Sequence, residues 1–158
     1  GNANSVSIYD CLNYFMMEET LSGNDMWYCS RCKDHVTANK KMEVYKAPDY
    51  LIIHLKDFTL TQRHVWLAQD KRLHQLPGER AGHEPIYQGA VADGNYTYDL
   101  YAVSNHFGSL SGGHYTAYAK NPVYEKWFNF DDTDVSRASE ANVVTQAAYV
   151  LFYKRRGV

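Results

Sequence analysis

Residues 112–132 read GGHYTAYAKNPVYEKWFNFDD, two aromatic-rich runs separated by an Asn-Pro step. Aromatic and β-branched residues favour pleated strands, so we expect strands over His114–Lys120 and Glu125–Asp131. The connection Asn121–Tyr124 suits a type I turn, because Asn is favoured at its first position and Pro at its second. The stretch therefore predicts an antiparallel β-hairpin.

The predicted turn sets which side chains face one another across the hairpin. It pairs Lys120 with Glu125, and counting back from that pair places His114 opposite Asp131. Directly opposed side chains have Cβ atoms about 5 Å apart, so His114 can bond the Asp131 carboxylate unless a β-bulge shifts the strands. Imidazole exchanges protons near neutral pH, and a carboxylate on one ring nitrogen fixes the tautomer. The hairpin thus suggests the base and the orienting group of a hydrolase; the alternative is a strand-end histidine beside solvated aspartates.

The composition describes an ordinary globular chain. It has 158 residues, 45% of them hydrophobic and 22% charged, which suits one domain with a real core. The formal net charge of -2, with no basic block, argues against a nucleic-acid partner. No apolar run approaches the roughly 20 residues of a membrane span. The odd count of three cysteines favours a reduced, cytoplasmic or nuclear setting.

Further elements follow from periodicity and turn signals. Ser7 is expected to cap a short amphipathic helix that ends near Met17. Tyr50–Phe58 is mostly apolar, which predicts a strand covered on both faces. The other expectations are long connections with two short strands in Thr59–Asn95, a strand over Tyr96–Asn105, a glycine-rich loop over Gly108–Gly113, a helical turn over Ser139–Val144 and a last strand over Ala147–Lys154.

Cys29 and Cys32 form a C-x-x-C knuckle, which is half of a tetrahedral zinc ligand set. His35 is a candidate third ligand. The pair could be half of a zinc ribbon, a redox pair or a knuckle that has lost its metal. Half a ribbon is favoured, because a redox pair normally opens a helix, whereas Lys33–Lys41 has a strand pattern.

Cys11 is the remaining thiol, and its position does not suit a nucleophile. It lies in the middle of the expected helix, on the apolar side next to Leu12 and Phe15. A nucleophilic cysteine is expected at a helix N-terminus or beside a base. The chain also has no G-x-S-x-G nucleophile elbow. We therefore expect the base and the carboxylate without the attacking group.

Taken together, several segments resemble one family. They are Trp27–Cys32, Leu51–Lys56, Tyr98–His106, Gly112–Tyr118, Phe130–Asp132 and Ala148–Tyr153. From about Val6 to Arg155 the chain resembles the C-terminal half of a ubiquitin-specific protease, a papain-like deubiquitinase. The resemblance implies an α+β fold with an antiparallel β palm and part of a zinc-ribbon fingers region, the thumb missing. Residues 1–158 would then be a single C-terminal portion of a catalytic domain.

The resemblance also implies roles for individual residues. His114 would be the general base, Asp131 the third member of the triad and Asp132 an auxiliary polar residue. Gly112, Gly113 and Tyr115 would bind the ubiquitin tail, and Cys29 and Cys32 would be two of four ligands of a structural zinc. The chain departs from the family pattern in three ways. It has no cysteine box and no first C-x-x-C pair, and Asp57 stands where Arg is usual.

The implied function is that of a thiol protease, the hydrolysis of peptide and isopeptide bonds after the C-terminal glycine of ubiquitin. Ubiquitin and ubiquitinated proteins would be its partners. The chain would supply the histidine and the aspartate, and would be inactive alone. A non-catalytic ubiquitin-binding or scaffold module is one alternative, and a zinc-ribbon interaction module is another. An exposed sheet edge could also support a dimer.

Overall fold

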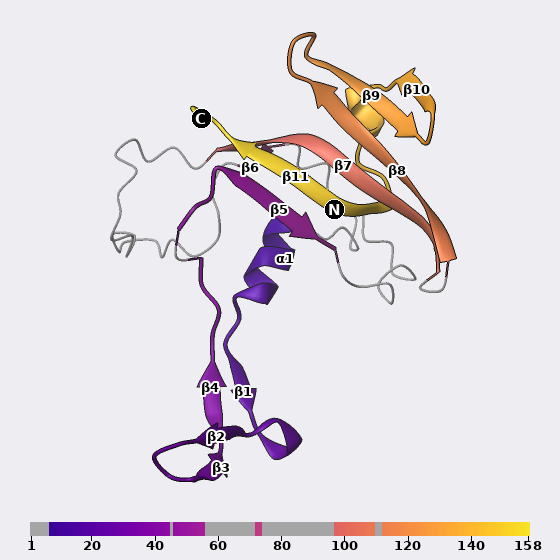
Figure 1. The fold of residues 1–158 in the computed structure, drawn as a ribbon. Helices are drawn as coiled ribbons and strands as arrows, with labels where there is room; N and C mark the ends of the chain where they lie inside the picture. The colour runs from indigo at the N-terminus through magenta and orange to yellow at the C-terminus, as the bar shows by residue number, and fades with distance from the viewer. Residues whose placement is uncertain (1–6, 45, 56–71, 74–96, 110–111) are drawn as a thin grey trace, which may run out of the picture.

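The computed structural model describes residues 7–44, 46–55, 72–73, 97–109 and 112–158. These residues form a mostly antiparallel β structure with one short α-helix (Figure 1). In chain order, the elements are α1 (Ile8–Phe15), β1 (Glu19–Leu21), η1 (Gly23–Asp25), β2 (Trp27–Cys29), β3 (Asp34–Val36), β4 (Ala38–Lys40), β5 (Tyr50–His54), β6 (Arg72–Leu73), β7 (Tyr98–Ser109), β8 (Gly112–Asn121), β9 (Lys126–Asp131), β10 (Asp134–Arg137), η3 (Glu140–Asn142) and β11 (Ala148–Arg155).

The main sheet has seven strands. Six of them follow the order β10-β9-β8-β7-β11-β5, and β6 pairs with the start of β7. All of these pairings are antiparallel. The predicted hairpin, the strand before it and the last strand therefore become neighbours, β9, β8, β7 and β11. The sheet is consistent with part of a protease palm.

α1 begins where the sequence predicted. The Ser7 hydroxyl accepts a hydrogen bond from the Asp10 backbone N–H at 3.1 Å, and the Asp10 carboxylate accepts one from the Ser7 N–H at 2.8 Å. This capping box satisfies two N–H groups that a helix start otherwise leaves without partners. Ile8 then joins the core with 1% of its surface exposed. The core consists of Ile8, Ala47, Tyr98, Leu100, Val103, Trp127, Val143, Leu151 and Tyr153.

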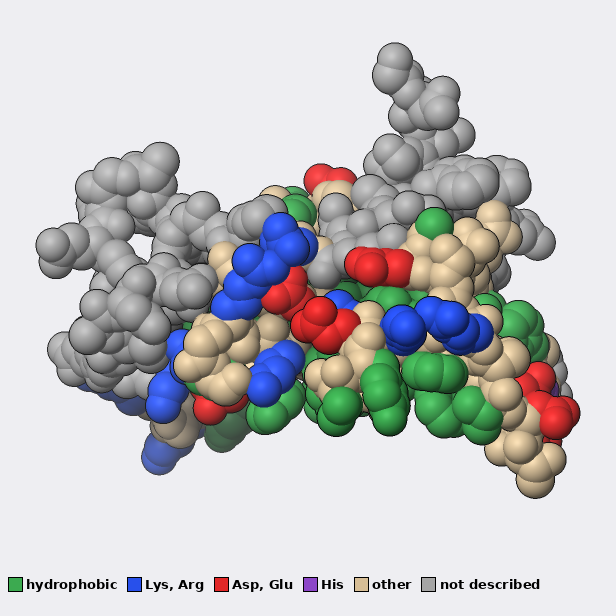
Figure 2. Space-filling view, turned by 90° about the horizontal axis from the view of Figure 1, so that it is seen from above, with side chains coloured by type: hydrophobic (Ala, Val, Ile, Leu, Met, Phe, Trp, Pro, Cys, Tyr) green, Lys and Arg blue, Asp and Glu red, His purple; other side chains and the backbone are tan. Residues whose placement is uncertain are grey.

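The prediction that the Tyr50 strand is covered on both faces is wrong. β5 alternates, with Leu51 and Ile53 half-buried, whereas Tyr50 and Ile52 are 56% and 61% exposed. A short apolar run cannot distinguish one covered face from two, because that depends on the neighbouring layers. Figure 2 shows hydrophobic side chains gathered along one long side of the molecule.

Two small ribbons project away from the main sheet. β1 pairs with β4, and β2 pairs with β3 farther out (Figure 1). β2 and β3 lie on the two sides of the Cys29–Cys32 knuckle. The strand pattern of Lys33–Lys41 corresponds to two strands in the structure, with β3 ending at Val36 and β4 beginning at Ala38.

Asp99 joins three segments at one end of the sheet. Its carboxylate accepts hydrogen bonds from Arg156 Nε at 2.6 Å, from a second Arg156 nitrogen at 2.9 Å and from Arg72 Nε at 3.1 Å. Arg156 thus holds the chain after β11, and Arg72 holds β6. The hydrogen bond with Arg156 is the main reason that the pKa of Asp99 lies below its usual value.

Some sequence expectations lie outside the described residues. They include Asp57 and the Thr59–Asn95 segment apart from β6. Within the described part of the chain, no helix has the length and apolar character needed to cross a membrane. The three cysteines are free thiols.

Candidate active site

The β8–β9 hairpin brings the candidate base and carboxylate together, but its register differs from the predicted one. Asn121 pairs with Lys126, so every pair is displaced by two residues from the expected alignment. The Asn121 side-chain oxygen accepts hydrogen bonds from the backbone N–H groups of Val123 and Tyr124, at 2.9 and 3.0 Å. Glu125 then closes the turn with a φ of 53°. The turn therefore starts one residue later than the predicted turn.

The displacement by two residues preserves the face on which each side chain lies, because side chains alternate with a period of two. His114 and Asp131 are consequently diagonal neighbours on one face. His114 Nε2 lies 2.5 Å from Asp131 Oδ1, so the predicted contact is present. The register prediction itself, with the two residues directly opposed, is wrong.

Asp131 raises the pKa of His114. The main cause is the hydrogen bond to the Asp131 carboxylate, followed by the charge of Asp131; loss of hydration acts in the opposite direction, and the charge of Asp132 makes the smallest contribution. Both side chains remain about half exposed, 49% for His114 and 45% for Asp131. Since Asp131 holds Nε2, Nδ1 is the ring nitrogen that can exchange a proton with a reacting group.

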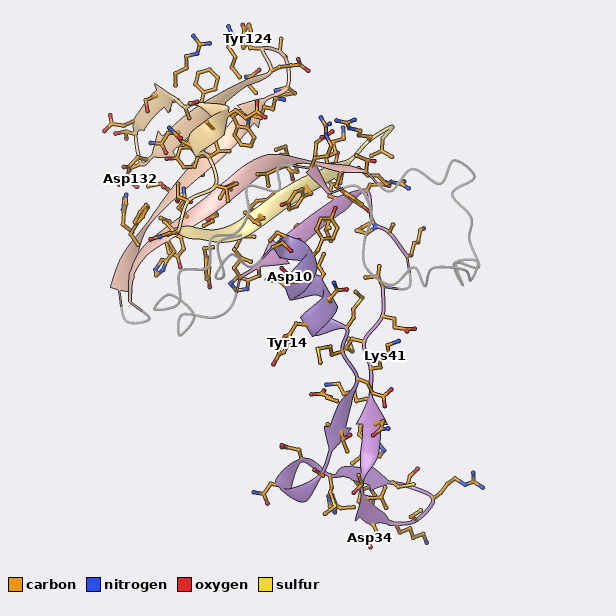
Figure 3. The ribbon with its side chains drawn as sticks, turned by 180° about the vertical axis from the view of Figure 1, so that it is seen from behind. Asp10, Tyr14, Asp34, Lys41, Tyr124 and Asp132 are labelled. Atoms are coloured by element: carbon orange, nitrogen blue, oxygen red, sulfur yellow. The ribbon has the colours of Figure 1, made fainter. Side chains whose placement is uncertain are left out.

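Asp132 lies in the two-residue turn between β9 and β10. Its φ of 48° is left-handed, a conformation that aspartate tolerates better than most residues. In Figure 3 it lies at the opposite end of the hairpin from Tyr124. Ligand atoms of His114, Asp131 and Asp132 lie within 4.8 Å of one another, close enough for one divalent cation. The same arrangement also suits a histidine that exchanges protons, because two carboxylates lie beside its ring.

Gly112 and Gly113 belong to β8 rather than to a loop, which corrects the expectation for Gly108–Gly113. Gly113 pairs with Gly108, and Gly112 pairs with Ser109. Paired glycines present no side chains to each other, so the strands continue closer together than other residues would allow. Tyr115 follows on the face opposite to His114, and 55% of its surface is exposed.

Tyr115 has two aromatic neighbours, Tyr149 and His106, that the sequence did not place beside it. The ring of Tyr149 lies 6.2 Å from that of Tyr115, and the ring of His106 lies 4.6 Å from it. His54 in turn packs edge-on against Tyr149 at 4.4 Å. A register shift between Ala148 and Val150 places Tyr149 in an irregularity of β11. No local sequence signal marks such an irregularity.

Cys29 and Cys32 lie at the tight connection between β2 and β3. The backbone N–H groups of Cys32 and Arg31 and the Cys32 side chain lower the pKa of the Cys29 thiol. This favours a thiolate, the form that binds zinc. His35 instead packs against Tyr28, with ring centroids 5.3 Å apart, and no third ligand joins the two cysteines among the described residues. The knuckle therefore fits half of a tetrahedral zinc site.

A family comparison identifies the chain. The family model of ubiquitin carboxyl-terminal hydrolases matches residues 12–153. The chain belongs to the ubiquitin carboxyl-terminal hydrolase family. The resemblance found in the sequence is thereby confirmed.

Curated relatives agree with the assignment to this hydrolase family. The putative ubiquitin carboxyl-terminal hydrolase 11 of Arabidopsis thaliana is 44% identical over 153 residues, which are 95% of this chain and 16% of the relative. Ubiquitin carboxyl-terminal hydrolase 4 of Rattus norvegicus is 43% identical over 152 residues, 96% of this chain and 16% of the relative. The chain thus spans about a sixth of the length of these hydrolases.

The third thiol, Cys11, lies in surroundings that do not suit a nucleophile. Cys11 lies within α1 and is half-buried. Burial is the main cause that raises its pKa, and the charge of Asp10 adds to it. A nucleophilic cysteine needs the opposite shift, so the structure gives Cys11 the properties of a packing residue.

Proposed function

We propose that this chain supplies the histidine and aspartate of a thiol-dependent deubiquitinase, which cleaves the bond after the C-terminal glycine of ubiquitin. The observation that carries the proposal is the contact of 2.5 Å between His114 Nε2 and Asp131 Oδ1, with His114 directly following Gly112 and Gly113 at the start of β8. Family membership supplies the substrate class.

In the proposed reaction, a cysteine outside this chain lies at Nδ1 of His114 and gives its proton to that nitrogen. The thiolate attacks the carbonyl carbon, and the imidazolium returns the proton to the leaving amine as a thioester forms. His114 then takes a proton from water as the water oxygen attacks the thioester carbonyl carbon. The C–S bond breaks, the free ubiquitin C-terminus leaves and the imidazolium returns its proton to the thiolate. Asp131 holds the imidazole in one orientation and stabilises the imidazolium.

Gly112, Gly113 and Tyr115 are proposed to contact the ubiquitin tail. The strand here has no side chains at its first two positions, so an extended peptide can approach its backbone. Tyr115 presents an exposed aromatic ring, which lies 6.2 Å from the half-buried ring of Tyr149. Asp132 is proposed as an auxiliary polar group, since its charge contributes to the raised pKa of His114.

We further propose that the chain is the C-terminal portion of a papain-like catalytic domain, with the main sheet as palm and the two ribbons as part of the fingers. Cys29 and Cys32 would hold a structural zinc together with two ligands from outside the chain. Two thiolates alone bind zinc weakly, so the full affinity would need those ligands. Within the described residues β5 and β10 form the sheet edges, where a second copy of the chain could pair.

The test joins the chain to the segment of the same protein that carries the nucleophilic cysteine, either as one polypeptide or by mixing. A fluorogenic amide of the ubiquitin C-terminus reports hydrolysis. His114→Ala is expected to lower kcat by at least about a hundredfold, the usual loss of a general base. The chain alone is expected not to react with an electrophilic ubiquitin C-terminus. Undiminished turnover by His114→Ala would overturn the proposal, as would labelling of Cys11.

A non-catalytic ubiquitin-binding module remains the second candidate, because the thiol nearest to the sheet core, Cys11, is not activated. The same assay separates the two functions. Ubiquitin binding without hydrolysis by the joined protein would favour the binding module.

A further inference from the structure

The ends of β7 and β8 that lead into the candidate site are held together by glycines. Gly108 pairs with Gly113, and Gly108 has a φ of 120°. A Cβ atom on Gly108 would lie 2.6 Å from the Gly112 carbonyl oxygen, so no other residue fits there without movement. Where glycines face each other, no pair of side chains opposes a slip of one strand past the other. Farther along, the Asn105 side chain donates a hydrogen bond to the Thr116 hydroxyl at 3.2 Å, but at the glycine end a contact from a neighbouring side chain is needed to hold β8 against β7.

His106 provides that contact. It pairs with Tyr115 and lies on the same face as Gly113. A Cβ atom on Gly113 would lie 2.3 Å from His106 Nε2 and 3.1 Å from its Cε1, so the imidazole already fills the space beside the glycine. The Phe107 carbonyl oxygen, at 2.5 Å, closes the same space from the backbone side.

The His106 ring is itself held from several directions. Its centroid lies 4.6 Å from the Tyr115 ring and 5.7 Å from the Tyr149 ring. The His106 backbone N–H donates to the Ala147 carbonyl oxygen at 2.9 Å, just before β11 begins. Residues of β7, β8 and β11 therefore all contribute to the position of the His106 ring, which packs between them.

We propose that His106 is a positioning residue of the active site, which acts through Gly113 and holds β8 in the register that brings His114 to Asp131. His114 lies on the other face of the sheet and directly follows Gly113, so His106 acts on it only through the backbone. A slip of two residues would keep His114 on its face but move it by about 7 Å. The contact with Asp131 would then be lost. The effect on catalysis rests on the proposed function, whereas the effect on His114 does not.

Three substitutions of His106 test whether its role depends on filling the space beside Gly113 or on the imidazole itself. In His106→Gln the side-chain amide reaches the position of Nε2, next to Gly113. In His106→Asn it reaches only as far as Nδ1, and in His106→Ala the space is empty. The pKa of His114 is measured by NMR titration of the 158-residue chain, and kcat and KM are measured in the joined protein.

We expect His106→Gln to resemble the wild type in both measurements. His106→Asn and His106→Ala should return the pKa of His114 toward its ordinary value and lower kcat by roughly tenfold to a hundredfold. His54→Ala is the matched control. It also removes an imidazole packed against Tyr149, yet none of the three heavy atoms nearest to a Cβ on Gly113 belongs to His54. It should leave the pKa of His114 unchanged.

An unchanged His114 pKa in His106→Ala would overturn the positioning role. A rise in KM alone would also overturn it, because His106 would then contact substrate rather than position β8. If the wild-type joined protein fails to hydrolyse ubiquitin amide, the proposed function fails. The NMR titration still decides the role of His106, since it needs no turnover.

Discussion

His114 and Asp131 meet across a diagonal of the β8–β9 hairpin, with Nε2 and Oδ1 2.5 Å apart. The backbone pairing of β8 with β9 ends at Ala117 and Phe130, so His114 and Asp131 lie beyond the last paired residues of these two strands. Diagonal neighbours lie farther apart at Cβ than directly opposed ones. The long imidazole spans this distance, and the hydrogen bond fixes the orientation of a side chain that is half exposed.

Replacement of Asp131 by Asn should lower the pKa of His114 toward the ordinary histidine value. The substitution removes the hydrogen bond to a charged acceptor and the charge itself, which are the two largest causes of the shift. NMR titration of the His114 ring protons checks this. Asp134→Asn is the control, because Asp134 pairs with Asp131 across the turn but does not contribute to the shift. Equal effects of the two substitutions would contradict the assignment.

The same shift predicts a pH dependence of folding stability. A raised pKa in the folded chain means that the folded state binds the proton more tightly than the unfolded state. The stabilisation is complete below the unfolded value of about 6.5 and is lost as the pH rises through the raised folded pKa. Urea unfolding of the wild type should show this decline, and Asp131→Asn should show a flatter profile across that window. Parallel profiles would exclude the linkage.

The thiols should differ in reactivity. Backbone hydrogen bonds lower the pKa of Cys29, whereas burial raises that of Cys11. Because the thiolate is the nucleophile, iodoacetamide near pH 7 should modify Cys29 well before Cys11. Mass spectrometry of digested protein at successive times measures both rates. In urea the two rates should converge, since both shifts depend on the fold; a difference that persists in urea would show another cause.

The His114–Asp131 contact was predicted correctly although the predicted register was wrong. Side-chain alternation depends only on whether a displacement is odd or even, and the displacement was even. The turn itself depended on the Asn121 side chain and on Glu125 taking a left-handed conformation. Several residues tolerate that conformation, so the choice of turn position is not visible in the sequence.

Non-local packing explains the features that sequence reasoning missed. β10 carries a single large apolar residue, Val135, and all four of its residues are exposed, so it has no alternating pattern to recognise. The grouping of His106 with Tyr149 depends on how β11 lies beside β7, more than 40 positions away in the chain. The helix start at Ser7, in contrast, is a local interaction and was predicted correctly.

Asp99→Asn should destabilise the chain by about 1 kcal/mol, an amount at the modest end for charged hydrogen bonds because the site is partly exposed. It weakens the contacts with Arg72 and Arg156. Since the pKa of Asp99 is lowered, this stabilisation is present above the unfolded value of about 3.9 and is lost as the pH falls through the folded pKa. Urea unfolding at neutral and acidic pH measures it, with exposed Asp25 replaced by Asn as control. A cost that stays the same in acid would contradict this explanation.

Ser7→Ala should also cost about 1 kcal/mol of stability, because it removes the hydroxyl that caps α1. The helix is only eight residues long, so its first turn is a large part of it. Ser22→Ala is a close control, since Ser22 occupies the corresponding position before η1 but makes no side-chain cap. The urea midpoint should fall for Ser7→Ala with an unchanged slope, and it should move little for Ser22→Ala. If the two midpoints fall equally, the cost comes from loss of a serine in general, and the capping box does not stabilise the helix that places Ile8 in the core.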